Sequence, residues 1–186
     1  MPFQQINLED IIFDPDVQKL CISENFKCPN YNHSWACPPE APYMKGEVSK
    51  YSKFFLVYIK FDLASYVKKQ KQKYPYRSEQ SIRNRFYMKN ILRDDLEKKI
   101  DSFLEKYNND FEEKLIFWDG HCRLCEKRDY QKCTYDDGDP CRFPNQIRYS
   151  MESVGIDVTK MVNNLDLDIE WPPVNYLYRF GLICLK

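Results

Sequence analysis

Glycine is scarce in this sequence, with only 5 copies among 186 residues. Loops that cradle phosphate groups need several closely spaced glycines, and neither a G-x-G-x-x-G nor a Walker-type pattern is present. The sequence also lacks an excess of either charge, because Lys and Arg together number 28, as do Asp and Glu. A neutral chain is poorly suited to coating nucleic acid, so the composition argues against a nucleic-acid partner.

Long apolar stretches are missing as well. The N-terminus has no basic start followed by an apolar run, so we expect no signal peptide. The longest apolar run, residues 54–61, contains Lys60 and is far shorter than the ~20 residues of a membrane-spanning helix. We therefore expect a cytoplasmic protein without a membrane partner, in a compartment where thiols stay reduced. Eight cysteines there indicate metal ligands, and a disulfide framework is the rival interpretation for a secreted chain.

The length and the apolar content of 43% predict a single metal-binding domain over residues 1–186. Aromatic and β-branched runs predict strands at residues 54–61, 114–118 and 176–185. Apolar residues three or four apart predict one long helix over 79–107 with Ser78 as its cap. A strand, a helix and a strand make a parallel crossover unit. The predicted fold class is α+β (or α/β), with a small mixed sheet, one long packed helix and two cysteine-rich metal-binding loops.

Cysteine placement is the strongest signal, because seven of the eight cysteines fall in two segments, 21–46 and 120–144. The first group is Cys21, Cys28 and Cys37, and the second is Cys122, Cys125, Cys133 and Cys141. Two thiolates spaced C-x-x-C can hold one metal site, and the second group supplies the four thiolates of a tetrahedral zinc or a cubane cluster. Proline soon after a cysteine, as after Cys37 and Cys141, is common around iron–sulfur clusters. The sequence therefore predicts one or two 4Fe-4S clusters, with zinc as the alternative.

The first group leaves alternatives open. Its three thiolates could hold a cubane with one open iron, or could borrow Cys184, His33 or a cysteine of the second group. Cys184, in a strand-like apolar run, fits a small buried hydrophobe better than a ligand, and Cys21 is a weaker candidate for the same role. Either His33 or His121 could ligate metal, donate a hydrogen bond to a ligand, or be an ordinary loop residue.

The sequence also predicts where the two cysteine segments lie relative to each other. If the strands near 54–61 and 114–118 are parallel neighbours, the segments lie at opposite edges of the sheet and form two separate clusters. Antiparallel strands would bring the segments together.

These motifs resemble a family of small prokaryotic proteins catalogued as predicted metal-binding proteins with a domain of unknown function. The matching residues are Cys28-Pro29-Asn30-Tyr31, Trp35-Ala36-Cys37-Pro38-Pro39, Gly120-His121-Cys122 with Cys125, Cys141-Arg142-Phe143-Pro144, Arg148, Ser150-Met151-Glu152 and Gly155-Ile156-Asp157-Val158. The resemblance implies a cysteine-bound metal centre of the iron–sulfur kind, and it implies no reaction. The gaps before Cys28 and before Cys133 are longer than is usual in the family, so it says less about Cys21 and Cys133.

Three functions compete. The first is an iron–sulfur protein that transfers electrons to or from a redox partner protein. The second is an enzyme that uses an open cluster iron on an unidentified small-molecule substrate, and the third is a zinc-stabilised module that engages RNA through the basic residues 68–77. Positive charges beside a thiolate cluster raise its reduction potential, and we expect Arg142 and Arg148 to lie beside the cysteine site and supply them. Alternatively, Arg148 pairs with Glu152 along a helix that Ser150 caps.

Overall fold

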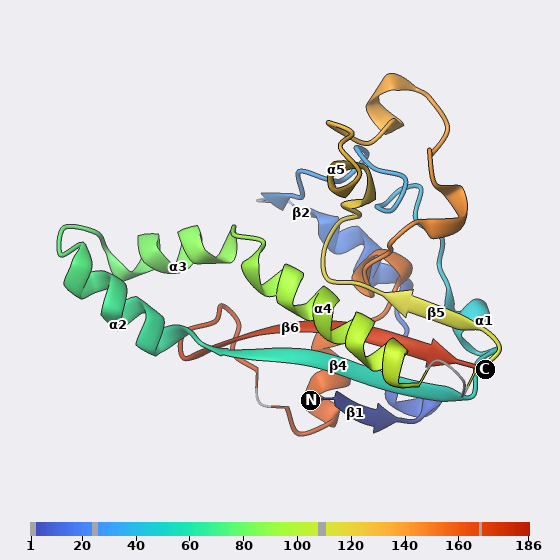
Figure 1. Cartoon of the computed structure of the whole chain (residues 1–186), viewed down its shortest axis with the longest axis horizontal. Coiled ribbons are helices and arrows are strands. Elements are labelled where there is room, and N and C mark those ends of the chain that lie inside the picture. Colours follow the sequence, from blue (N-terminus) through green and yellow to red (C-terminus); the bar gives the residue numbers. More distant parts are fainter. Residues whose placement is uncertain (1–2, 24–25, 108–110, 168) are drawn as a thin grey trace.

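The main sheet is antiparallel throughout. The computed structural model describes residues 3–23, 26–107, 111–167 and 169–186. The spatial order of its four-stranded sheet is β1 (Phe3–Ile6), β4 (Lys53–Asp62), β6 (Tyr176–Leu185) and β5 (Lys114–Phe117), and every neighbouring pair is antiparallel (Figure 1). A separate hairpin joins β2 (Ile22–Ser23) to β3 (Phe26–Lys27). The three predicted strands are confirmed, whereas the predicted mixed sheet is wrong.

The strand order also corrects the predicted crossover. Strand β6 pairs with β4 along its whole length, from Lys53↔Leu185 to Asp62↔Tyr176. It pairs with β5 only over residues 182–185. Strands β4 and β5 therefore run in the same direction, as a crossover through helices requires, but the last strand of the chain lies between them. In the described chain, residues 176–181 of β6 have no strand partner on the β5 side.

The predicted long helix is two helices. They are α3 (Glu79–Tyr87) and α4 (Ile91–Lys106). The Ser78 hydroxyl caps α3 as expected, because it accepts a hydrogen bond from the Ser81 N–H at 3.2 Å. The chain then tightens where the Lys89 N–H donates to the Phe86 carbonyl at 3.0 Å, and this three-residue spacing ends the α-helix.

The remaining helices are short, apart from α2. They are α1 (Lys45–Val48), α2 (Leu63–Lys73), α5 (Leu124–Lys127) and α6 (Val158–Asn164). A longer 3-10 helix covers Pro15–Cys21, and single 3-10 turns cover Leu8–Asp10, Tyr135–Asp137, Pro144–Gln146 and Glu152–Val154. None of the helices in the described ranges is both long and apolar enough to cross a membrane.

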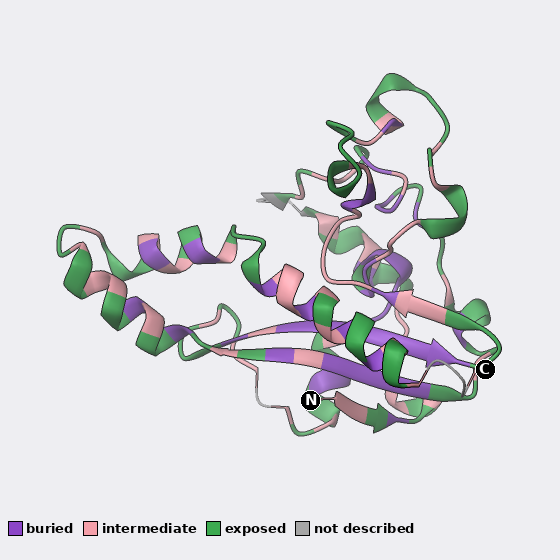
Figure 2. Cartoon of the chain, in the orientation of Figure 1, coloured by how far each residue is buried: buried purple, intermediate pink, exposed green. Residues whose placement is uncertain are grey.

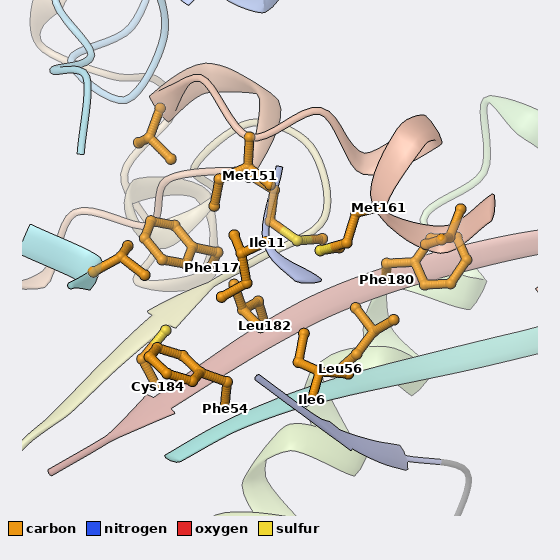
Figure 3. Packing of buried hydrophobic residues seen from close by; sticks show 14 residues of the cluster. Ile6, Ile11, Phe54, Leu56, Phe117, Met151, Met161, Phe180, Leu182 and Cys184 are labelled. Carbon is orange, nitrogen blue, oxygen red and sulfur yellow. The ribbon is translucent and has the colours of Figure 1, made fainter. Parts of the chain in front are cut away.

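Helices cover one face of the sheet and irregular segments with α6 cover the other (Figures 1 and 2). On the helix face, Leu96, Ile100 and Phe103 of α4 pack with residues of β4 and β6. On the other face, Met151, Ile156 and Met161 join Phe54, Leu56, Leu182 and Cys184 in one cluster (Figure 3). Because both faces are buried, β4 and β6 are apolar without alternation, which explains their continuous apolar runs.

Candidate metal centre

The second cysteine segment begins where β5 ends. The Trp118 N–H donates to the Tyr149 carbonyl at 2.8 Å, which holds the end of β5 against the segment that follows Cys141. Gly120 then adopts φ +71°, and a Cβ there would lie 2.6 Å from the Arg93 guanidinium. Only glycine fits this turn without displacing Arg93. The turn directs the chain away from β6 and into the C-x-x-C loop.

The C-x-x-C loop is held by the short helix α5. Leu124 is 6% exposed and anchors the loop in the protein interior. The Tyr130 N–H donates to the Cys125 carbonyl at 2.9 Å, which closes the turn after the helix. Cys122 and Cys125 remain half-buried, so their thiols stay within reach of a bound ion.

A cavity of about 350 Å³ lies beside this loop. All four cysteines of the second group line it, and each is half-buried: Cys122, Cys125, Cys133 and Cys141. Both histidines of the chain, His33 and His121, also line the cavity. Burial lowers the pKa of His121, with the nearby Arg93 charge acting in the same direction, which favours the neutral ring.

The three cysteines of the first group lie close to one another. The Cys28 N–H donates to the Cys21 carbonyl at 2.8 Å, and Cys37 is 8% exposed. Burial raises the pKa of Cys21 to about 11, and the neighbouring Cys28 adds to the shift. Burial likewise raises the pKa of Cys37 to about 12, with contributions from Cys28 and from Cys122. Ser34 and Ala36, close to Cys37 in the sequence, line the cavity of the second group, so this part of the first segment lies beside that cavity.

The two cysteine segments meet, so their predicted separation at opposite sheet edges is wrong. His33 Nδ1 lies 2.8 Å from Asp136 Oδ1, and the Tyr135 hydroxyl donates to Asn32 at 2.8 Å. The Trp35 ring packs edge-on against the Tyr135 ring at 4.9 Å, and its indole N–H donates to the Asp139 carbonyl at 3.2 Å. Residues of the first segment accordingly line the same 350 Å³ cavity as the second group.

The path of the chain between Cys37 and β4 explains why the two cysteine segments meet. The chain does not enter the strand directly after Pro39, because residues 40–52 intervene. The Met44 N–H donates to the Val154 carbonyl at 3.2 Å, and the Tyr43 ring fills the space beside Gly155, 2.5 Å from where a Cβ would be. This stretch runs along the segment after Cys141 and leaves Cys37 on the side of the sheet where Cys122 lies.

The cysteine side chains that line the cavity are chemically suited to bind a metal. Soft sulfur ligands suit zinc and iron–sulfur clusters, and Cys141 accepts a hydrogen bond from the Phe143 N–H at 3.4 Å, as cluster sulfurs commonly do. Within the described residues, however, no three or more Cys, His, Asp or Glu side chains are arranged to hold one metal ion. Burial raises the pKa of Cys141, so its thiol stays protonated until a metal displaces the proton. The ligand assignments made from the sequence therefore stay predictions.

The two predicted arginines lie in different places. Arg142 Nη1 lies 3.6 Å from Cys125 Sγ and donates to the Lys132 carbonyl at 2.8 Å, so this arginine is beside a cysteine as expected. Arg148 instead stacks over the Trp118 ring at 4.0 Å and pairs with Glu97 at 2.7 Å. The proposed helical pair of Arg148 with Glu152 is therefore wrong.

Sequence reasoning missed an ion-pair network that joins α4 to the C-x-x-C loop. Arg123, between the two cysteines, is 5% exposed and pairs with Asp94 at 2.9 Å and with Glu97. Lys127 and Arg148 also pair with Glu97. The partners are far apart in the sequence, so no local spacing predicts the network. The one available signal was an arginine inside the C-x-x-C motif, because a guanidinium buried there needs a carboxylate nearby.

Cys184 lies away from this site. It is 0% exposed in β6 and belongs to the sheet core of Figure 3. Burial raises its pKa, which is typical of an inert structural thiol. Its interpretation as a small buried hydrophobe is confirmed.

Comparison with known proteins adds one match. The model of a family described as "Predicted metal-binding protein (DUF2284)" matches residues 4–185. No curated protein and no solved structure matches the chain.

Proposed function

We propose, from the premise that this chain belongs to the DUF2284 family of predicted metal-binding proteins, that it binds iron–sulfur clusters and transfers electrons to or from a partner protein. One observation supports this above all others. The four cysteines of the second group line a single 350 Å³ cavity, and Pro29 and Ala36, which adjoin Cys28 and Cys37 in the sequence, line it too. Thiols gathered in this way, in a chain with few other candidate catalytic groups, are typical of an iron–sulfur protein.

The second group would hold the first cluster. Its ligands would be Cys122, Cys125, Cys133 and Cys141, and Cys21, Cys28 and Cys37 would serve a second cluster. A bound cluster supplies one-electron oxidation and reduction. The chain's own part is to hold the cysteines, to shield them from water and to set the charge around them.

Several residues lie where they can shield the cysteines and set the charge around them. The Phe143 N–H points at Cys141 Sγ, and the Arg142 guanidinium lies near Cys125 Sγ. Both stabilise negative charge on sulfur, so both would raise the reduction potential. The Trp35 and Tyr135 rings cover the junction of the two segments and limit the access of water.

A second candidate is an enzyme with an open cluster iron. The observation that favours it is the three-thiol first group, which offers one ligand fewer than a cubane has irons. A fourth cysteine shared from the second group, such as Cys122, would close that iron. Substrate-dependent change in the spin-resonance signal of the reduced protein would distinguish this candidate from simple electron transfer.

Anaerobic purification followed by iron, zinc and sulfide analysis tests the main proposal. We expect a brown protein with iron and sulfide in equal amounts and with blue absorption that dithionite bleaches. Cys125→Ser should lose iron, whereas Cys184→Ala, which removes a thiol from the sheet core, should keep it. A colourless protein that contains zinc and no sulfide would overturn the proposal and support a zinc-stabilised module.

A further inference from the structure

A second cavity, of about 590 Å³, lies along the part of β6 that has no strand partner on the β5 side. Leu20 and Asp119 border it, and these residues come directly before Cys21 and before the Gly120-His121-Cys122 turn. Helix α6 and the connector 169–173 provide further walls. The volume suits a small organic molecule. The cavity therefore lies between the starting points of both cysteine segments and uses none of the cysteines.

Aromatic rings form much of the wall. The cavity is lined by Tyr87, Trp171, Tyr176, Tyr178 and Phe180. Trp171 is 77% exposed although it is large and apolar, and its ring lies 6.3 Å from that of Tyr87. The Tyr178 and Phe180 rings are nearly parallel, with an interplanar angle of 3°. Flat rings along one wall, two of them exposed, favour a planar ligand that can pack against them.

Arg179 supplies hydrogen-bond donors to this cavity. It is 5% exposed, and its guanidinium lies 4.5 Å above the Tyr87 ring. Its Nη1 lies 3.5 Å from Asp119 Oδ1, and its Nη2 donates to the Tyr87 carbonyl at 3.2 Å. Its Nε has no hydrogen-bond acceptor among the residues that the structure describes. Because these contacts are long or missing, the buried guanidinium retains donor capacity for a ligand.

Glu152 supplies the acceptor. It lines the cavity and forms no ion pair within the described ranges; burial raises the pKa of its carboxyl, and a hydrogen bond from its own backbone only partly offsets this. The other two acids of the wall are already engaged, since Asp119 pairs with Arg93 at 2.9 Å and Glu170 accepts the Asn175 N–H at 2.6 Å. Arg179, whose charge Asp119 partly neutralises at 3.4 Å, and the Glu152 carboxyl therefore face the space, and together they disfavour a simple anion as well as a simple cation.

We propose that this cavity binds a small, planar, uncharged nitrogen heterocycle that accepts a hydrogen bond from Arg179 and donates one to Glu152. The ring would pack against Trp171 and the tyrosines. This is a binding activity beyond the metal centre, and it requires no metal. Because the cavity lies between the two cysteine segments, a molecule bound in it would be beside the proposed clusters.

Four soluble ring compounds test the proposal on the full-length, anaerobically purified protein. Isocytosine and nicotinamide are neutral rings with a donor and an acceptor, benzoate is an anionic ring, and benzamidine is a cationic ring. Quenching of tryptophan fluorescence should report binding, and Trp171→Phe should remove that signal. We expect the neutral rings to bind with dissociation constants of about 1 mM and at least tenfold more tightly than either charged ring.

Two pairs of variants locate the site. Glu152→Gln should weaken isocytosine about fivefold and strengthen benzoate, because it removes negative charge, whereas the surface control Glu113→Gln should change neither. Thr159→Trp, on the exposed first turn of α6, should fill the cavity and abolish binding, and Thr159→Ala should not.

Three outcomes would overturn the proposal. They are tighter binding of a charged ring than of both neutral rings, isocytosine binding that is unaltered in Glu152→Gln and in Thr159→Trp, and no binding of any ring at about 10 mM. Iron and sulfide content, measured on the same preparations, stays independent of these results. A failure of this proposal is therefore distinct from a failure of the metal centre.

Discussion

The Glu97 carboxylate on helix α4 pairs with the guanidinium of Arg123, which lies between the two cysteines of the C-x-x-C loop. Arg123 is 5% exposed, and the side chain of Glu97 is 15% exposed, so the pair is largely shielded from water. Arg148 reaches the same carboxylate at 2.7 Å. A single acidic residue of the helix layer thus fastens the second cysteine segment through Arg123 and Lys127, and the chain that follows it through Arg148.

Replacing Glu97 by Gln should lower the free energy of unfolding by about 1–3 kcal/mol, because Arg148 loses its ion-pair partner and the shielded Arg123 keeps only Asp94. Urea denaturation at neutral pH measures this loss. Glu47→Gln is the matched control, since Glu47 pairs with Lys50, both side chains are more than half exposed, and the pair should contribute at most about 1 kcal/mol. Equal losses in the two variants would contradict the anchoring role of Glu97.

The same carboxylate should make stability depend on pH. Burial by itself would raise the pKa of Glu97, but the hydrogen bond from Lys127 and the charges of Arg123 and Arg148 outweigh it, so the pKa lies below its ordinary 4.5. A carboxyl with a lowered pKa stabilises the fold above its unfolded pKa, and this contribution is lost as the pH falls through the folded pKa.

The stability gap between the native chain and Glu97→Gln should therefore be constant above about pH 5.5 and shrink as the pH falls below the ordinary pKa of glutamate. Urea denaturation of both proteins in metal-free form measures the gap without a contribution from metal release. A gap that stays the same down to about pH 3 would show that the Glu97 pKa is not the cause.

The strands could be predicted from the sequence, whereas their order could not. Residues 54–61 and 176–185 are apolar on both faces because both faces of the sheet are covered, and such runs are visible in a single sequence. Pairing of the last strand between β4 and β5 depends on contacts between distant parts of the chain. Helix α2 was also missed, because only Leu63 and Val67 of its residues are buried and the rest look like a basic loop.

The candidate site, like the fold, could be predicted from the sequence only in part. Clustered cysteines identified the segments, since local spacing is what a metal site needs. Their meeting through His33–Asp136 and Tyr135–Asn32 depends on residues about a hundred positions apart, and no local pattern predicts it. The 590 Å³ cavity could not be predicted either, because the residues that line it come from distant parts of the chain between Leu20 and Phe180.

Arg142 should tune the reduction potential. Replacing it by Gln removes a positive charge 3.6 Å from Cys125 Sγ, so the potential should fall by about 20–60 mV. Arg85→Gln removes the same charge from the exposed surface of α3, a helix with no residue in the lining of the 350 Å³ cavity, and should leave the potential unchanged. Spectroscopic titration with dithionite measures both. Equal shifts would mean that net charge, rather than the contact with Cys125, sets the potential.

The number of clusters follows from how the seven cysteines are divided. One cubane uses four thiolates, and the second group alone supplies four, so the close first group has ligands left for a second cluster. We therefore expect about eight irons and eight sulfides per chain in the anaerobic protein. A double variant, Cys28→Ser with Cys37→Ser, should retain about half of each, and Cys184→Ala should retain all. About four of each in the native chain, unchanged in the double variant, would instead show that the first segment only supports a single cluster held by the second.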